Sequence, residues 1–543
     1  MTGMFHRAVA RAVSPLLSFA DRRPMGAALA AAQERILRKL LRTLAPLPVG
    51  RHFGLDKVAA HAPAAGSSLV ADFRRLVPIN GYGEHAELIA RVAAGERDVM
   101  FPGRALALAQ TSGTTSGATS GHAGERYVPQ NADLLRHHST CGAAAFFRLL
   151  QATGVGLLDG RLLMLGGSTA LTPNAVGIPV GDLSGIIAQR VPAWLRPLYE
   201  PGLDIALESD WERKLERVAE RLGHADVRLV SGIPAWQLIL FERVCRRRDL
   251  SRIRIAWPNL SGFIHGGHAI TPFLPTLRNH LSSDTWLFEV YPASEAFIAV
   301  GSRAWRLDEQ GPPALDLLCD HGVFLEFAPA DGGLGDGDEV VGPESLVDGR
   351  LYRVLVTTPA GLVRYQLGDL VLGAGPGRVR FAGRVKARIS VFGEHVEGVH
   401  LDGALAAAVS ASGAEVAHYH VAPILPGGSD HHACGAHEWL IEFTRAPADA
   451  QRFAALLDQH LRVHVLDYDA HRAGGQLAEA RLTALPAGTF HRFLADAGKL
   501  GGQHKMPQAW GDRTIADALA SAACHSPSST GSALNATESP HAR

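Results

Sequence analysis

The chain lacks long apolar runs and lacks cysteines at paired spacings. No segment of its 543 residues approaches the roughly 18 consecutive apolar residues that indicate a membrane helix. Five scattered cysteines do not form the closely spaced pairs of a disulfide framework. We therefore expect a protein that does not span a membrane and that works in a reducing compartment, for which the cytoplasm is the simplest assignment. The cysteines are Cys141, Cys245, Cys319, Cys434 and Cys524.

The chain also lacks an excess of charge of either sign. Lys plus Arg and Asp plus Glu each number 53, so no basic surface for nucleic acid is expected. A small-molecule substrate is the default partner, and the composition gives no oligomeric state. Lysine itself is scarce because most of the basic residues are arginine, which makes each lysine informative. The lysines are Lys39, Lys57, Lys214, Lys386, Lys499 and Lys505.

Two common active-site motifs are missing. A kinase-type phosphate loop needs Lys and then Ser or Thr after its last glycine, whereas Gly117 is followed by Ala118 and Thr119. No Gly-x-Ser-x-Gly elbow of a serine hydrolase is present either. A nucleotide site in this chain would need a different phosphate loop.

The stretch from Leu106 to Pro129, LALAQTSGTTSGATSGHAGERYVP, is typical of a strand followed by such a loop. Gly113 and Gly117 let backbone N–H groups approach an anion, and hydroxyls supply further donors. Taken alone, the same cluster fits a flexible surface loop equally well. The hydroxyl side chains are Thr111, Ser112, Thr114, Thr115 and Ser116.

Three further motifs favour the nucleotide interpretation. They are VYPASEAF at 290–297, LVRYQLGDLV at 362–371 and GGQHKMP at 501–507. Together with the loop, they resemble the Gretchen Hagen auxin-responsive family of acyl acid amido synthetases, within the wider superfamily of firefly luciferase and acyl-CoA synthetases. The resemblance covers nearly the whole chain and implies an enzyme that activates a carboxylic acid with ATP and Mg²⁺.

The resemblance also implies roles for particular residues. Glu295 would hold Mg²⁺, which prefers carboxylate and phosphate oxygens. Asp369 would accept hydrogen bonds from the ribose hydroxyls, and Lys505 would be the catalytic cation at the α-phosphate. The remaining nucleotide-binding residues would be Thr111, Ser112, Gly113, Thr114, Thr115, Ser116, Tyr291, Ser294, Arg364 and Arg384. Arg364 would either reach the phosphates or stabilise the loop that carries Asp369.

The chain departs from the family pattern in its phosphate loop. The family usually has a lysine a few residues after the last glycine of the loop, but here ATSGHAGE intervenes and the basic residue before Tyr-Val-Pro is Arg126. Either Arg126 reaches back to the phosphates, or His122 and Arg126 act differently on the pyrophosphate.

The order of patterns predicts an α/β fold. Strands and helices alternate up to about residue 297, which indicates a large N-terminal α/β domain with ligands at the carboxyl ends of its strands. Residues 322–381 read as a β-rich subdomain, in which GAGPG at 373–377 is a hairpin turn. We expect a large domain at 1–383, a small mobile α/β domain at 384–515 and a disordered tail at 516–543. The N-terminal residues 1–24 would form a packed or frayed helix.

Local patterns also predict individual elements. Ile36, Leu37, Leu40 and Leu41 lie on one face at helical spacing, which predicts an amphipathic helix over about 31–44. Residues 209–222 are expected to form a helix with Asp210 near its start, and residues 253–267 a strand.

Two other groups of residues admit more than one interpretation. The segment DHHACGAHEW at 430–439 contains zinc-ligand side chains, but its spacing fits no standard closed site. Four apolar or aromatic residues are candidate walls of an acid pocket and are equally normal for a core. These residues are Trp236, Phe263, His265 and Phe297.

The leading hypothesis is a ligase that forms an acyl-adenylate and passes the acyl group to an amine, most simply that of an amino acid. Two alternatives remain open. The acceptor could be the thiol of coenzyme A or of a carrier protein, or the chain could bind nucleotide without turnover. The identity of the acid is not indicated by the sequence.

Overall fold

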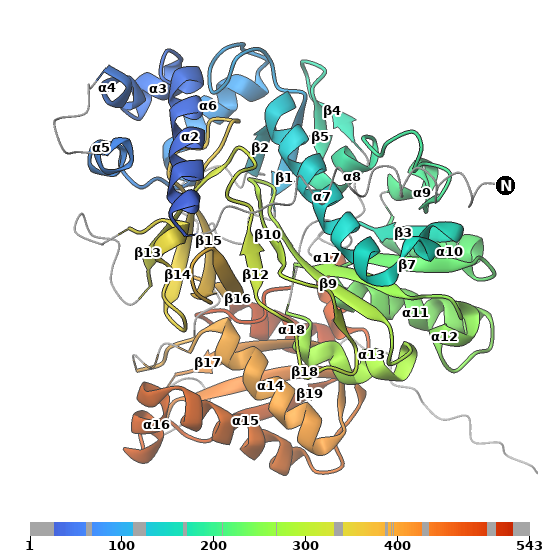
Figure 1. Cartoon of the computed structure of the whole chain (residues 1–543). Helices are drawn as coiled ribbons and strands as arrows, with labels where there is room; N and C mark the ends of the chain where they lie inside the picture. Colours follow the sequence, from blue (N-terminus) through green and yellow to red (C-terminus); the bar gives the residue numbers. More distant parts are fainter. Residues whose placement is uncertain are drawn as a thin grey trace, which may run out of the picture.

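The computed structural model describes residues 26–60, 68–111, 126–166, 171–208, 210–267, 269–330, 340–385, 389–392, 394, 396–425, 434–496 and 506–524. A twelve-stranded mixed sheet is the largest element of these residues (Figure 1). Its parallel half runs in the order β9, β8, β7, β3 and β6. These strands are β9 (Trp286–Pro292), β8 (Gly262–Gly266), β7 (Val227–Gly232), β3 (Arg161–Leu165) and β6 (Tyr199–Glu200).

The other half of this sheet is antiparallel and continues from β9 through β10, β12, β16, β15, β14 and β13. It contains the predicted β-rich segment, and residues 373–377 lie at the turn between β15 and β16, as predicted. The strands are β10 (Phe297–Gly301), β12 (Leu315–Leu317), β16 (Arg378–Arg384), β15 (Tyr365–Gly373), β14 (Leu351–Thr357) and β13 (Phe324–Pro329), with β11 (Trp305–Arg306) paired to β9.

Helices cover both faces of the parallel half, which explains why its strands are short apolar runs rather than alternating ones. The side chain of Asn131 caps α7 (Ala132–Thr153) on one face. On the other face, the side chain of Asp210 caps α10 (Trp211–Leu222), which packs beside α11 (Pro234–Arg247). Shorter helices complete these layers: η1 (Val155–Asp159), α9 (Leu203–Ala206), α12 (Ile253–Ala256), η2 (Thr271–Phe273) and α13 (Leu274–His280).

One strand begins later than its sequence pattern predicts. Residues 253–267 were expected to be a single strand, but residues 253–256 form α12 and β8 begins at Gly262. Pro258 lies between them and has no N–H to give to a sheet. The apolar run therefore divides into a helical turn and a strand.

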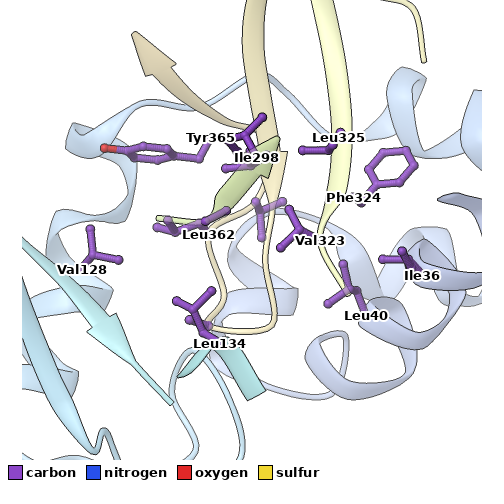
Figure 2. Packing of buried hydrophobic residues seen from close by; sticks show 14 of the residues in the cluster. Ile36, Leu40, Val128, Leu134, Ile298, Val323, Phe324, Leu325, Leu362 and Tyr365 are labelled. Atoms are coloured by element: carbon purple, nitrogen blue, oxygen red, sulfur yellow. The ribbon is translucent and has the colours of Figure 1, made fainter. Parts of the chain in front are cut away.

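The N-terminal helices pack against the antiparallel half of the large sheet. The predicted amphipathic helix is present as α2, whose Ile36 and Leu40 lie close to Phe324 in the core (Figure 2). A four-stranded sheet in the order β2, β1, β5, β4 adjoins this core. The elements are α2 (Ala27–Leu44), α3 (Pro48–His52), α4 (Leu55–Ala60), α5 (Leu69–Leu76), α6 (Tyr82–Ala93), β1 (Ala107–Thr111), β2 (Arg126–Gln130), β4 (Thr172–Pro173), β5 (Pro179–Gly181), α8 (Leu183–Ala188) and η3 (Pro343–Ser345).

The C-terminal elements form a separate three-stranded sheet in the order β17, β18, β19, drawn in orange and red in Figure 1. Helices α14 and α15 cover one face of this sheet, and α17 and α18 cover the other. The elements are α14 (Gly398–Ser412), β17 (Glu415–Ile424), β18 (Ala436–Arg445), α15 (Ala450–His464), α16 (Leu466–Ala473), β19 (Arg481–Leu485), α17 (Thr489–Asp496) and α18 (Thr514–Cys524).

The α/β class and the division into a large part and a smaller C-terminal part are thus as predicted. The beginning of the tail differs, because α18 continues to Cys524 and buries Ala516 and Leu519 completely. These two residues occupy the apolar face of a short helix in an Ala-rich segment, where composition alone indicated disorder. Among the described residues, no helix is long and apolar enough to cross a membrane.

Candidate active site

A cavity of about 920 Å³ opens at the carboxyl ends of the parallel strands β7, β8 and β9. This is the edge at which open α/β sheets bind ligands. Residues from β15 and β16 line the same cavity, and so do residues 506–510 of the small domain. The volume falls within the usual range for ligand sites, at its upper end. The arrangement therefore offers one site built from both domains.

A polar cluster joins three of the predicted residues in this cavity. The hydroxyl of Tyr291, near the end of β9, donates a hydrogen bond of 2.7 Å to Asp369 Oδ2 on β15. Asp369 Oδ1 lies 3.1 Å from Nε of Arg384, its cross-strand partner on β16. The carboxylate of Asp369 raises the pKa of Arg384, and burial together with Asp369 raises that of Tyr291 well above its usual value. Three strands thus hold one acidic, one basic and one phenolic group together.

The Arg384 side chain is the accessible member of this cluster. It is 46% exposed, against 5% for the side chain of Asp369, so its guanidinium can meet a ligand while its Nε stays near the carboxylate. The adjacent Gly383 has a φ of +114°, and a Cβ there would lie 3.2 Å from Cα of Gly398. Only glycine allows this close approach between the end of β16 and the start of α14.

Glu295 and Ser294 lie on the turn between β9 and β10 and line the cavity. Gln130 Nε2 donates a hydrogen bond of 3.0 Å to the carbonyl of Ser294, which fixes the turn against β2. Burial raises the pKa of Glu295 to about 7, and Asp369 adds to this rise while Arg384 and Arg126 oppose it. These charges act on one another because they surround the same space. The loop places a carboxyl where an added cation would favour its ionised form.

The predicted phosphate loop begins and ends beside this space. Thr111 is the last residue of β1 and pairs with Arg126, the first residue of β2. Arg126 lines the cavity, and its guanidinium carbon lies 4.8 Å from the ring centre of Tyr82. Ser112, Gly113, Thr114, Thr115 and Ser116 lie outside the described residues, as do His122 and the side chain of Thr111. Arg126 is therefore a basic group at the base of the loop, on the cavity side.

Lys505 also lies outside the described residues, but the chain immediately after it is fixed. Val421 of β17 exchanges backbone hydrogen bonds with this segment, with Val421 N to Gln508 O at 2.9 Å and Trp510 N to Val421 O at 3.1 Å. His420 Nδ1 lies 2.7 Å from the carbonyl of Pro507. Met506 to Trp510 line the cavity, so the small domain brings the residue next to Lys505 to the site.

Arg364 is not brought to the cavity. Its Nε donates to Glu326 Oε2 at 3.0 Å, and its Nη1 donates to the carbonyls of Arg74 and Val77 at 3.0 and 2.7 Å. Only 4% of the residue is exposed. The guanidinium connects β13 to the C-terminal end of α5 and the residue after it, so Arg364 holds these elements together rather than lining the cavity.

The expected apolar walls divide into two groups. Trp236 and Phe297 line the cavity, whereas Phe263 and His265 are completely buried in the core of the sheet. Burial lowers the pKa of His265 to about 3, and neither of its ring nitrogens has a hydrogen-bond partner among the described residues. His265 is thus a neutral core side chain.

Charged residues that the sequence analysis did not select also line the cavity. Lys214 Nζ donates to the carbonyls of Ala206 at 2.8 Å and Gly166 at 3.1 Å, and burial lowers its pKa to about 8. Glu289 lies on β9 two residues before Tyr291. The signal for Glu289 was present in the sequence, because it is an acid within the apolar run TWLFEVY. The scarcity of lysine marked Lys214 in the same way.

The described part of the His-rich segment at 430–439 lies in the small domain and does not line the cavity. His437 Nε2 lies 2.7 Å from Glu394 Oε1 in the interior of the small domain, and both side chains are fully buried. Cys434 Sγ lies 3.2 Å from the carbonyl of Gly475, and His431 and His432 lie outside the described residues. Within the described ranges, no group of three or more His, Cys, Asp and Glu side chains could hold a metal ion.

The charged side chains around the cavity nevertheless fit a nucleotide with its magnesium ion. Asp369 Oδ1 is buried without a hydrogen-bond donor of good geometry, so a hydroxyl could donate to it. Arg384 and Arg126 supply positive charge for phosphates, and Glu295 is a single carboxylate of the kind that binds Mg²⁺ together with phosphate oxygens. These residues face one space.

Family models match three parts of the chain. The GH3 family N-terminal domain matches residues 25–216, the GH3 family central domain matches residues 317–384 and the GH3 family C-terminal domain matches residues 399–514. In Oryza sativa subsp. japonica, the GH3.10 protein is provisionally named an indole-3-acetic acid-amido synthetase. It is 24% identical to this chain over 450 residues, which cover 73% of this chain and 90% of the rice protein.

Solved structures show the same fold. AtGH3.15 acyl acid amido synthetase in complex with 2,4-DB superimposes with a TM-score of 0.72 at 15% identity, covering 94% of this chain and 96% of that one. A 2-hydroxyisobutyryl-CoA ligase in complex with 2-HIB-AMP gives a TM-score of 0.58 at 14% identity, covering 93% and 94%. This chain shares the fold of both enzymes. The three family models together match more than half of its residues and show that the chain belongs to the GH3 family.

Proposed function

We propose that this protein is an ATP-dependent acyl acid amido synthetase. It activates a carboxylic acid as an acyl-adenylate and then transfers the acyl group to an amine, most simply the amino group of an amino acid. The observation that carries the proposal is the convergence of the base of the 111–126 loop, Glu295 and Asp369 on one cavity. Family membership supports it, since curated relatives are named amido synthetases.

The first half-reaction requires an anionic carboxylate to attack an anionic α-phosphate, so the site must supply positive charge and alignment. The accessible guanidinium of Arg384 lies beside Asp369, which would orient the ribose through its carboxylate. Arg126 at the base of the phosphate loop supplies a second cation. Magnesium, held by Glu295, would neutralise the displaced pyrophosphate. The residues 111–116 would contribute hydroxyl and backbone donors to the phosphates.

The small domain contributes the remaining cation. Lys505 directly precedes Met506, which lines the cavity. A lysine at this position would supply a positive charge to the α-phosphate and the attacking carboxylate. Release of this segment by movement of the small domain would open the site for the second substrate. Two polar contacts between the domains, His491 to Glu212 at 2.8 Å and Asn279 to Glu415 at 2.6 Å, are at least partly exposed to solvent. Such contacts oppose reorientation only weakly.

The experiment that tests this function is acid-dependent exchange of labelled pyrophosphate into ATP. A panel of aromatic and aliphatic acids, including benzoate, indole-3-acetate and decanoate, is assayed with Mg²⁺ and ATP. The acids that support exchange are then incubated with glycine, alanine or aspartate and, separately, with coenzyme A. Exchange followed by amide formation supports the proposal. Thioester formation without amide identifies a thioester synthetase, and ATP binding without exchange identifies a protein that binds nucleotide without turnover.

A further inference from the structure

Glu289 occupies the wall of the cavity between its two ends. It lies on β9, and its partner on the neighbouring strand β8 is His265. Beyond β8, the cavity extends to the end of β7 and to Trp236. On the other side, two residues along the same strand, Tyr291 reaches Asp369. Side chains two residues apart share a face of a strand and are about 7 Å apart. Glu289 is therefore next to the proposed nucleotide position, on the side where the acyl group must lie.

The carboxyl of Glu289 is isolated from other polar groups of the protein. Among the residues that the structure describes, it makes no hydrogen bond and no ion pair, although it is only partly covered. Burial raises its pKa to about 7, and no charge within the described part of the chain offsets this effect. Glu289 therefore presents to the cavity a carboxyl that has no partner among the described residues, and a ligand bound there can supply that partner.

The sign of the charge limits what that ligand can be. A carboxylate repels the carboxyl group of the acid and the phosphates of ATP, so neither is its partner. It would also repel the phosphates of coenzyme A. An ammonium group, by contrast, gains a charge-assisted hydrogen bond to this carboxylate. Amino acids carry such a group at neutral pH, and the amide cannot form until that group loses a proton.

We propose that Glu289 binds the ammonium group of the amine acceptor and takes its proton during acyl transfer. The inference rests on the amido synthetase function proposed above and assigns a catalytic residue to its second half-reaction. The ammonium proton moves to the Glu289 carboxylate, and the freed nitrogen lone pair attacks the carbonyl carbon of the acyl-adenylate. A C–N bond forms, the C–O bond to the phosphate breaks, and AMP leaves with the electron pair. The second proton of the acylated nitrogen passes to solvent, which leaves the neutral amide.

Glu289→Gln is the direct test because glutamine keeps the size of the side chain and removes its negative charge. Each variant is assayed for pyrophosphate exchange, for amide formation with glycine and for hydroxamate formation with hydroxylamine. Hydroxylamine is largely uncharged near neutral pH, so it needs no carboxylate to accept a proton. We expect exchange and hydroxamate formation to stay within a few-fold of wild type. Amide formation with glycine should fall about 10- to 100-fold in kcat/KM, the loss expected for one charge-assisted hydrogen bond.

Glu242→Gln is the matched control. Glu242 is also a glutamate whose pKa is raised by burial, but it lies on α11 and does not line the cavity. It should leave all three activities unchanged. If Glu289→Gln lowers the glycine and hydroxylamine reactions equally, the residue is structural and the proposal is wrong. The proposal is equally wrong if neither reaction changes while wild type forms amide.

The pH dependence gives a second readout that does not need the glutamine variant to fold. In wild type, protonation of Glu289 as the pH falls through about 7 should lower the ratio of glycine to hydroxylamine transfer. Glu289→Asp keeps the negative charge but shortens the side chain, which moves the carboxylate away from the cavity. This variant should lower that ratio at every pH. A ratio in Glu289→Asp equal to that of wild type would overturn the proposal. Absence of any exchange or amide in wild type would instead refute the amido synthetase function itself.

Discussion

Glu289 in the cavity and Glu394 in the small domain are glutamates in opposite surroundings. Glu394 Oε1 lies 2.7 Å from His437 Nε2, and its oxygens accept backbone hydrogen bonds from Val391 and Phe392. Although burial opposes the shift, these partners lower its pKa to about 2. Glu289 has no such partner among the described residues, and burial raises its pKa to about 7.

The difference separates structural from functional acids within one chain. Where the protein supplies every partner, the charged form of the carboxyl stabilises the fold. Where the protein supplies no partner, as at Glu289 among the described residues, a bound ligand can stabilise the charged form. We therefore expect substitutions of buried acids in the small domain to change stability. Substitutions in the cavity should change activity instead.

The largest expected effect tests whether the small domain does more than provide a scaffold. Lys505→Ala should lower acid-dependent pyrophosphate exchange about 10²- to 10³-fold, because an electrostatic group aimed at the developing charge is lost. Thermal unfolding should not change. Lys499→Ala, six residues earlier, is the control for loss of positive charge in the same segment. Exchange by Lys505→Ala at the wild-type rate would contradict the adenylation role of this lysine.

The next effect is on stability and has a defined pH dependence. Glu394→Gln should lower the free energy of unfolding at pH 7 by about 2–3 kcal/mol, because a hydrogen-bonded charged group is lost from the interior. The pKa of Glu394 falls from 4.5 to about 2 on folding, so its stabilisation is complete above pH 4.5 and is lost as the pH falls through about 2. Urea unfolding of both proteins between pH 7 and pH 3 should show the difference narrowing. A difference that stays constant would assign the loss to packing alone.

A somewhat smaller effect is expected at the polar cluster of the cavity. Asp369→Asn removes the charge beside Arg384 and the acceptor facing the proposed ribose site, so KM for ATP should rise about 10-fold. Tyr291→Phe removes only the hydroxyl that donates to Asp369 and should raise KM for ATP less. Initial rates of pyrophosphate exchange at saturating acid measure both. Equal KM values in wild type and Asp369→Asn would remove Asp369 from the nucleotide site.

Local patterns predicted much of this architecture. Apolar residues at helical spacing located α2, and an Asp before such a pattern located the start of α10. The Gly-Pro turn at 373–377 was recognisable because no helix follows it. These features depend on a few neighbouring residues. Tyr291, Asp369 and Arg384, which come together here, were selected by resemblance rather than by any local rule.

Where the sequence left alternatives open, contacts between distant residues decided between them. Arg364 lies within a motif expected at the nucleotide. Its φ of +41° and its hydrogen bonds to Glu326 and to the carbonyls of Arg74 and Val77 direct its side chain into the core. His265 lies one residue before the end of β8, which borders the cavity, but its ring is completely buried and packs against Trp305. To select Glu289 as a site residue, one must know which face of β9 opens into the cavity. The spacing of residues along the sequence does not predict any of these three positions.

The smallest expected effect concerns the surface contact between the two domains. His491 Nε2 on α17 lies 2.8 Å from Glu212 Oε1 on α10, and the two side chains are 39% and 42% exposed. An exposed pair of this kind contributes roughly 0.2–1 kcal/mol, so His491→Gln should change amide formation by no more than about fivefold. Its effect should diminish further in high salt, which screens exposed charges. A much larger loss that salt does not reduce would mean that a fixed domain orientation, rather than the lining of the cavity, limits the reaction.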